Sequence, residues 1–156
     1  MGMSQYLQGH LLDAIFGGGA AQTAYTGQAT CYIGVSTATY TTSLLDATLL
    51  AAEPSSTGSY ARIVVTNNAT NFPAATLSTA TTTKKLHVSF SFAASSAAWS
   101  TGATALASFF IADASTLGAG NVLYMGALSP ATDVVNGAGV TFSFAIDALQ
   151  MTLAPA

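Results

Sequence analysis

Residues 58–73 have the sequence GSYARIVVTNNATNFP, which combines a strong strand signal with the turn formers that bound it. The segment from Tyr60 to Thr66 is mostly aromatic or β-branched, and such residues suit a pleated, largely buried surface. Gly58 before the segment and Asn67-Asn68 after it are typical turn residues. The pattern predicts a central strand of a sheet.

Arg62 interrupts this apolar strand and is one of only three Lys and Arg residues in the chain. A guanidinium among apolar neighbours needs an exposed face or a partner, because charges at buried sites are normally paired. We therefore expect Arg62 to face outward and to bind neighbouring carbonyls or an Asp.

The composition limits the classes of partner. The 156 residues fit one domain that can bury a core; 51% are hydrophobic and 6% are charged. No apolar run reaches the roughly 18 residues of a membrane span, so we expect no membrane partner. The formal charge of −3 argues against nucleic acid, whose phosphates require clustered Lys and Arg.

The weakly charged surface also favours contacts between subunits, because net charge is what usually keeps free proteins apart. We expect a homo-oligomer, with a trimer as the favoured form. The chain has one cysteine, Cys31, which excludes an internal disulfide framework; its apolar neighbours indicate a buried, unreactive thiol.

The N-terminal segment from Ser4 to Phe16 has apolar residues at helical spacing, with Ser4 as a candidate N-cap and Gly17-Gly18-Gly19 as the stop. A signal peptide is the alternative, but a basic first region is missing and polar residues interrupt the apolar face. We predict an N-terminal helix and Gly-rich hinge over residues 1–18 and a β-sandwich domain over residues 19–156. The candidate interface residues lie on this helix: Tyr6, Leu7, Leu11, Leu12, Ile15 and Phe16.

Beyond the glycines, apolar residues recur at a spacing close to two residues, which is typical of strands. The cleanest alternation of apolar and polar residues is in Leu86–Phe92, which follows a low-complexity stretch from Ala74 to Thr83. A short helical turn is expected around Leu44–Leu50. Gly34 suggests a bulge or a close backbone approach. The other expected strands are Ala29–Ser36, Ala105–Ala112, Asn121–Leu128, Gly139–Ile146 and Leu149–Leu153, with turns at Gly118–Asn121 and Asn136-Gly137.

Several short strands after one helix predict an all-β fold, a single antiparallel β-sandwich with a short N-terminal amphipathic helix. One core is expected to hold the large apolar side chains of these strands: Tyr32, Ile33, Val64, Phe90, Phe92, Phe110, Tyr124 and Phe144.

Motifs for catalysis are missing from the sequence. It has no Gly-rich phosphate loop, metal-binding His or Cys motif, or nucleophile elbow, so we expect no enzyme and no catalytic, cofactor or metal residues. Trp99 is expected to pack at the edge of the sandwich with its indole N–H satisfied; a sugar site is the alternative. Structural roles are expected for Tyr60, Arg62, Asn67, Phe72, Pro73 and Trp99.

Several segments occur in the same order as in a family of small tailed-bacteriophage structural proteins, usually labelled tail fibre, minor structural or capsid decoration protein. The most specific part runs from Tyr60-Ala61-Arg62 to Asn71-Phe72-Pro73, and the sequence departs from the family at 74–83 and 94–105. The other matching segments are Tyr6–Gly17, Ala29–Thr37, Glu53-Pro54, Trp99, Phe110–Ala114 and Leu123–Leu128.

The resemblance implies a non-enzymatic virion protein, assembled in the host cytoplasm, whose partners are the major capsid protein or tail proteins. Between positions, the sequence favours a capsid decoration protein that stabilises the head, because no extended repeats or coiled-coil heptads of a fibre shaft are visible. The alternatives are a tail-associated or tail fibre protein that contacts a host surface glycan, and a hydrolase that acts on that glycan.

Overall fold

The computed structural model describes residues 2–16, 27–41, 43–77, 81–99, 105–132 and 138–153. All paired strands in these ranges are antiparallel, which confirms the all-β fold. The helical elements are α1 (Gln5–Phe16), α2 (Asp46–Ala51) and the short 3₁₀ helix η1 (Ser56–Gly58). The strands are β1 (Gly2–Met3), β2 (Thr30–Ser36), β3 (Ile63–Thr66), β4 (Thr76–Leu77), β5 (Thr82–Lys85), β6 (Phe90–Ser91), β7 (Leu106–Ala112), β8 (Val122–Thr132), β9 (Ser143–Phe144) and β10 (Gln150–Leu153).

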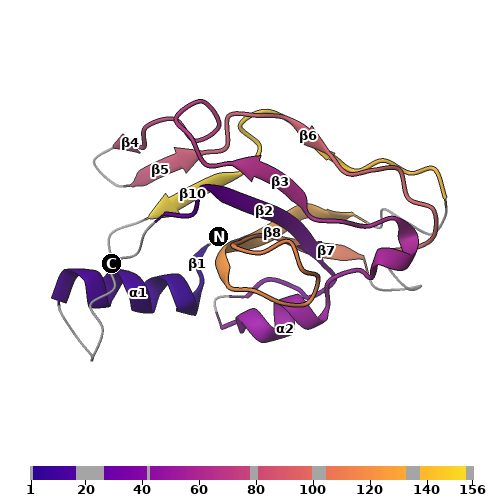
Figure 1. The fold of residues 1–156 in the computed structure, drawn as a ribbon, viewed down its shortest axis with the longest axis horizontal. Coiled ribbons are helices and arrows are strands. Elements are labelled where there is room, and N and C mark those ends of the chain that lie inside the picture. Colours follow the sequence, from indigo (N-terminus) through magenta and orange to yellow (C-terminus); the bar gives the residue numbers. More distant parts are fainter. Residues whose placement is uncertain are drawn as a thin grey trace.

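The strands form three sheets. The largest has the order β1-β8-β7-β2-β3, and the smaller ones have the orders β10-β5-β4 and β6-β9. In Figure 1 helix α2 lies below the large sheet, and β4, β5 and β6 of the smaller sheets lie above it. The large sheet is therefore the central layer of the molecule.

The main hydrophobic cluster fills the space between the large sheet and the smaller sheets. It takes Ile33 and Val35 from β2 and Ile111 from β7, and Phe92 and Phe144 from the opposing layer. Side chains at alternate positions of a strand share one face, so the intervening residues point the other way. This arrangement accounts for a sandwich core.

A second cluster covers the other face of the large sheet. Leu49 and Leu50 of α2 pack there against Phe110 and Met125. Gly34 lies opposite Phe110 in the ladder, and a Cβ on Gly34 would come within 2.3 Å of the Phe110 ring. The close backbone approach expected at Gly34 is what makes room for this ring.

The predicted single core needs three corrections. Phe110 belongs to the second cluster, Tyr32 is half-buried and belongs to neither cluster, and Val64 is 64% exposed. Val64 alternates with Val65, whose side chain is the one that enters the main core. A run of consecutive apolar residues such as Ile63-Val64-Val65 does not indicate which face of the strand is covered.

The predicted central strand at Tyr60–Thr66 is wrong in position. β3 begins at Ile63 and is an edge strand that pairs only with β2 among the described strands. At its outer side the Thr66 carbonyl accepts a hydrogen bond from Asn71 Nδ2 at 2.9 Å, where a further strand would otherwise pair. A side-chain amide thus protects part of this edge.

The other strand predictions hold in part. The predicted segments at Ala29–Ser36, Ala105–Ala112 and Leu149–Leu153 contain β2, β7 and β10, whereas β8 extends four residues beyond the predicted Leu128. Within the predicted strand Leu86–Phe92, only Phe90–Ser91 is a strand. The other residues bond to loops instead; the His87 backbone N–H, for example, donates to the Asn71 carbonyl. The expected hinge at Gly17–Gly19 and turn at Asn136-Gly137 lie outside the described residues.

Candidate functional site

Helix α1 begins as the sequence predicts. The Leu7 backbone N–H donates to Ser4 Oγ at 3.1 Å, which is an N-cap bond, and the Ser4 hydroxyl donates to the Val122 carbonyl of β8. β1 pairs with β8 immediately before the helix, with Gly2 opposite Met125. The N-terminal end of α1 is therefore fixed to the large sheet.

Asp46 of α2 lies near this fixed end. Burial raises the pKa of its carboxyl, and a hydrogen bond from the Tyr6 backbone offsets part of that rise. Its Oδ1 is buried and accepts no hydrogen bond from the described residues. The carboxylate thus links the two helices at a cost in solvation.

The six interface candidates divide along α1. Tyr6 and Leu7 are half-buried and pack against the main core. Leu11, Leu12 and Ile15 are 39%, 56% and 62% exposed, while the side chain of the sixth candidate, Phe16, lies outside what the structure describes. The helix therefore binds the sheet through its first turn and presents an apolar face along its second half. We call Leu11, Leu12 and Ile15 the α1 apolar face.

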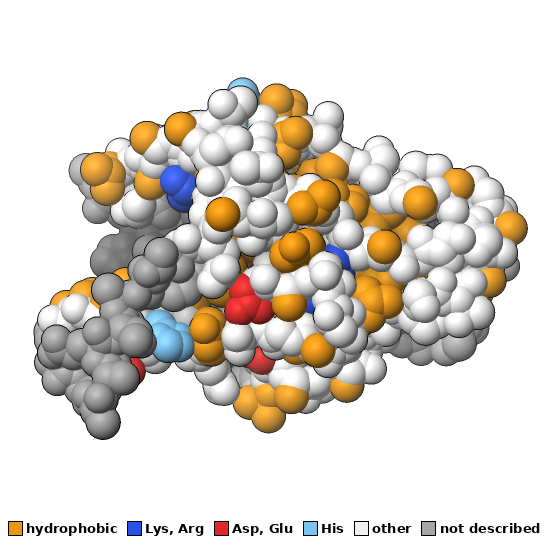
Figure 2. All heavy atoms as spheres, in the orientation of Figure 1, with side chains coloured by type: hydrophobic (Ala, Val, Ile, Leu, Met, Phe, Trp, Pro, Cys, Tyr) orange, Lys and Arg blue, Asp and Glu red, His pale blue; other side chains and the backbone are white. Residues whose placement is uncertain are grey.

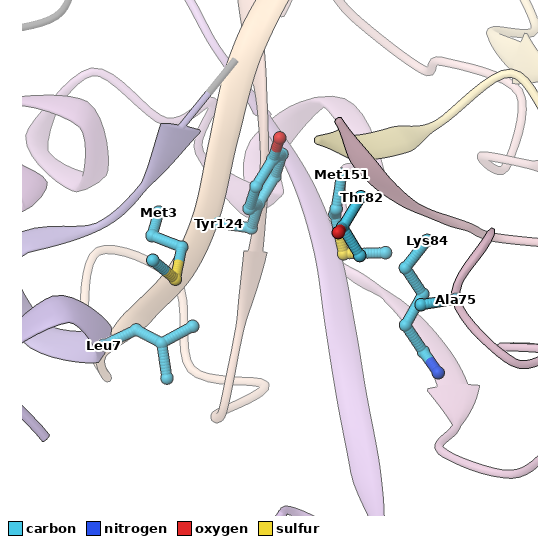
Figure 3. Close-up of a pocket in the computed structure, with 7 residues that line it drawn as sticks. All are labelled: Met3, Leu7, Ala75, Thr82, Lys84, Tyr124 and Met151. Carbon is cyan, nitrogen blue, oxygen red and sulfur yellow. The ribbon is translucent and has the colours of Figure 1, made fainter. Parts of the chain in front are cut away.

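A groove lies beside this helix. Figure 3 shows Met3, Leu7 and Tyr124 on one side of it and residues of β5 and β10 on the other. Its volume is about 230 Å³, and it continues into a second hollow of about 170 Å³ that shares Leu7 and Tyr124. We call this feature the apolar groove, and its lining residues are Met3, Leu7, Ala75, Thr82, Lys84, Tyr124 and Met151.

Of the described residues that line the groove, only Lys84 carries a formal charge. Its Nζ donates to the Pro73 carbonyl at 3.1 Å, and it forms no ion pair with any described residue. Burial raises the pKa of the Tyr124 phenol, which therefore stays neutral and accepts a hydrogen bond from the Thr152 backbone N–H at 3.0 Å. The groove thus joins an apolar wall to a cation without a carboxylate partner.

Arg62 is buried, and the expectation that it faces outward is wrong. Its Nε and Nη2 donate to the two carboxylate oxygens of Glu53 at 2.8 and 2.7 Å, and the two side chains are 0% and 1% exposed. Its Nη1 donates to the carbonyls of Ala114 and Ala119 at 2.7 and 3.0 Å. The expected carbonyl partners are present, but the acid is a Glu, and the guanidinium carbon lies 5.0 Å from the centre of the Phe110 ring.

Glu53 organises this polar cluster. It also accepts the Tyr60 hydroxyl at 2.9 Å and the Gly118 backbone N–H at 2.8 Å. Burial and the negative charge of Glu53 raise the pKa of the Tyr60 phenol. The cluster joins the segment before β3 to the β7–β8 turn, so its role is to hold loops in place. No local pattern in the sequence pairs Glu53 with Arg62.

The other residues expected to be structural lie around the core. Phe72 and Trp99 are buried in the main cluster, Pro73 is half-buried and Asn67 is exposed. The Trp99 indole N–H donates to the Gly58 carbonyl at 2.7 Å, and its ring contacts Tyr60 and Phe92 edge-on. A buried indole of this kind does not present a face to a sugar.

Titratable side chains outside these sites are dispersed. In the described ranges no three His, Cys, Asp or Glu side chains come close enough to hold a metal ion, and no helix there has the length and hydropathy to cross a membrane. Cys31 is buried, and burial raises the pKa of its thiol. His87 and Asp147 form an exposed pair, with 2.9 Å between Nδ1 and Oδ1.

The family follows from a match to nearly the whole chain. A family model described as podophage GP4 fiber I protein gp80 matches residues 2–152. The chain belongs to this family. The resemblance to tailed-phage structural proteins is thereby confirmed, and the chain is a phage structural protein that interacts with other virion components. No curated protein matches its sequence.

Proposed function

We propose that this chain is a non-enzymatic component of a podophage tail fibre, attached to neighbouring virion proteins through the α1 apolar face. The match of residues 2–152 to a fiber I family carries the proposal. The location of the exposed apolar side chains supports it, because Leu11, Leu12 and Ile15 stand together on one helix whose other end is fixed to the sheet.

The character of the surface fits a permanent place in an assembly. Figure 2 shows few charged side chains on the visible face, which consists mostly of neutral and apolar atoms. Charged residues make up 6% of the sequence, so little repulsion opposes close packing against other subunits. The sandwich, whose loops are held in place by the cluster of Glu53 and Arg62, would form the main part of such a subunit.

Capsid decoration, which the sequence favours, stays a prediction, and the two positions differ in measurable ways. Quantitative mass spectrometry gives the copy number of the chain per particle. For a fibre this copy number should match that of tail proteins, whereas for a decoration protein it should approach the copy number of the major capsid protein. Particles made without the chain should keep their heat resistance but fail to adsorb to host cells. The reverse pairing, heat-sensitive particles with normal adsorption, would replace the fibre proposal by decoration.

Attachment through α1 has its own test. Replacing Leu12 and Ile15 by Gln keeps helix-compatible side chains of similar length and removes apolar area that is already exposed, so the fold should be retained. Incorporation into particles should fall sharply. Val64→Gln on β3, which alters an equally exposed apolar residue away from α1, is the matched control and should incorporate normally. Normal incorporation of the α1 variant would place the attachment surface elsewhere.

A further inference from the structure

We propose that the N-terminal arm is exchanged between copies. The arm consists of residues 2–16, with β1 and α1, and we call the rest of the chain the body. In the exchanged arrangement the arm of one copy occupies the β8 edge of a second copy, and the α1 apolar face is buried between the two bodies. This inference rests on the proposed function, because exchange needs copies that stand next to one another, as fibre subunits do.

The bonds that hold the arm could be made by any copy of the body. Gly2 pairs with Met125 of β8, and the Ser4 backbone N–H donates to the Leu123 carbonyl at 3.3 Å. The Ser4 hydroxyl donates to the Val122 carbonyl. These bonds join the arm to the backbone of β8, which every copy presents in the same way. The β8 edge therefore accepts an arm from its own chain or from another chain with the same bonds.

The length of chain between the arm and β2 permits both arrangements. Residues 17–29 join Phe16, the last residue of α1, to Thr30, the first residue of β2, and they begin with three consecutive glycines. A stretch of this length can reach about 40 Å when extended, well beyond the radius of gyration of about 15 Å of a domain of this size. A short flexible linker gives an effective concentration in the mM range, and subunits packed side by side also stand at mM concentrations. The linker alone therefore does not restrict the arm to its own body.

The α1 apolar face favours exchange over the closed arrangement, in which the arm stays on its own body. In the closed arrangement Leu11, Leu12 and Ile15 remain 39%, 56% and 62% exposed, and in Figure 1 the helix runs from β1 towards the periphery of the molecule. After exchange the same helix lies between two bodies, the one with which β1 pairs and the one to which residue 17 leads. Burial of the apolar face there is a gain that the closed arrangement does not provide.

Cysteine cross-linking in the purified full chain distinguishes the two arrangements. One chain carries Gly2→Cys and a second carries Met125→Cys, so neither can form the arm-to-β8 disulfide by itself. The two positions are opposite each other in the ladder, and the Cα separation of such a pair, about 5.5 Å, suits a disulfide. Refolded together from urea and then oxidised, the two chains should give a covalent dimer that contains one of each.

The matched control replaces the arm position by an exposed position on β3. Val64→Cys mixed with Met125→Cys should give about a hundred-fold less mixed dimer, which is the ratio of a mM effective concentration to chains at about 10 μM. A chain with both Gly2→Cys and Met125→Cys checks that the variants fold and that the two thiols meet. Met3→Cys with Tyr124→Cys, the next pair in the ladder, repeats the test if the first pair does not oxidise.

Two results would overturn the exchange. The first is a double-cysteine chain that oxidises entirely within itself up to about 1 mM, together with mixed dimer no more abundant than in the control. The second concerns the α1 apolar face: Leu12→Gln with Ile15→Gln in the Gly2→Cys chain should lower the yield of mixed dimer about ten-fold, and an unchanged yield would show that this face is not buried between the bodies.

Failure here is distinguishable from failure of the proposed function. A chain whose arm stays on its own body yet incorporates into tails would overturn the exchange and leave the fibre role standing. A chain that forms mixed dimers but is missing from the tails of purified particles would overturn the fibre role alone.

Discussion

Replacing Glu53 by Gln should be among the most destabilising conservative substitutions in this chain. The change keeps the size of the side chain but removes its charge, so the buried guanidinium of Arg62 loses its counter-ion while both side chains remain essentially inaccessible. Breaking a buried pair in this way costs about 3–5 kcal/mol, because an uncompensated charge is left in the interior. The Tyr60 hydroxyl and the Gly118 N–H also lose a charged acceptor.

Urea unfolding followed by circular dichroism measures this loss, and at this chain length it corresponds to a melting temperature lower by about 6–20 °C. Asp147→Asn is the matched control, since it neutralises the acid of an exposed pair. It should change stability by less than about 1 kcal/mol. A loss below about 1 kcal/mol for Glu53→Gln would show that water reaches the pair and that its burial has been misjudged.

Two further substitutions test the packing of the large sheet and the junction of the helices. Gly34→Ala should cost about 1–3 kcal/mol in thermal unfolding, because its Cβ would meet the Phe110 ring at 2.3 Å; a neutral result would show that the ring moves aside freely. Asp46→Asn should flatten the dependence of stability on pH. Burial raises the pKa of Asp46 in the folded chain, so its contribution is complete at low pH and is lost as the pH rises through that pKa. Urea unfolding at about pH 3 and about pH 7 should therefore show the variant gaining relative to the wild type at the higher pH, and an unchanged difference between the two proteins would contradict this.

Local patterns predicted the elements whose signals are local. The Ser4 cap, the helix after it and the strands β2 and β7 follow from residue spacing and β-branched or aromatic side chains. The composition of β7 also indicates that both of its faces are covered, since its sequence LASFFIA is apolar at nearly every position. A strand with both faces covered has such a composition, which explains why Phe109 and Phe110 enter different clusters.

Long-range partners could not be predicted from the same patterns. Arg62 needs a partner on any physical argument, but six acids were available and nothing local favoured Glu53. The edge position of β3 depends on which strands pair, and strong β propensity occurs in edge and central strands alike. The apolar groove is built by β1, α1, β5, β8 and β10, so no single stretch of sequence contains it.

The scarcity of charge favours contact between subunits but does not by itself give that contact a direction. Apolar burial is not directional, so a neutral surface alone favours contact without choosing an orientation. Most of the described acids are already committed within the fold, as Glu53 is to Arg62 and Asp147 is to His87. The few charges left over can therefore fix orientation with little competition. Among the described residues, the charges that form no ion pair include Asp13 on α1 and Lys84 and Lys85 on β5, so any orientation that charge imposes on a neighbouring subunit has to come largely from these two elements.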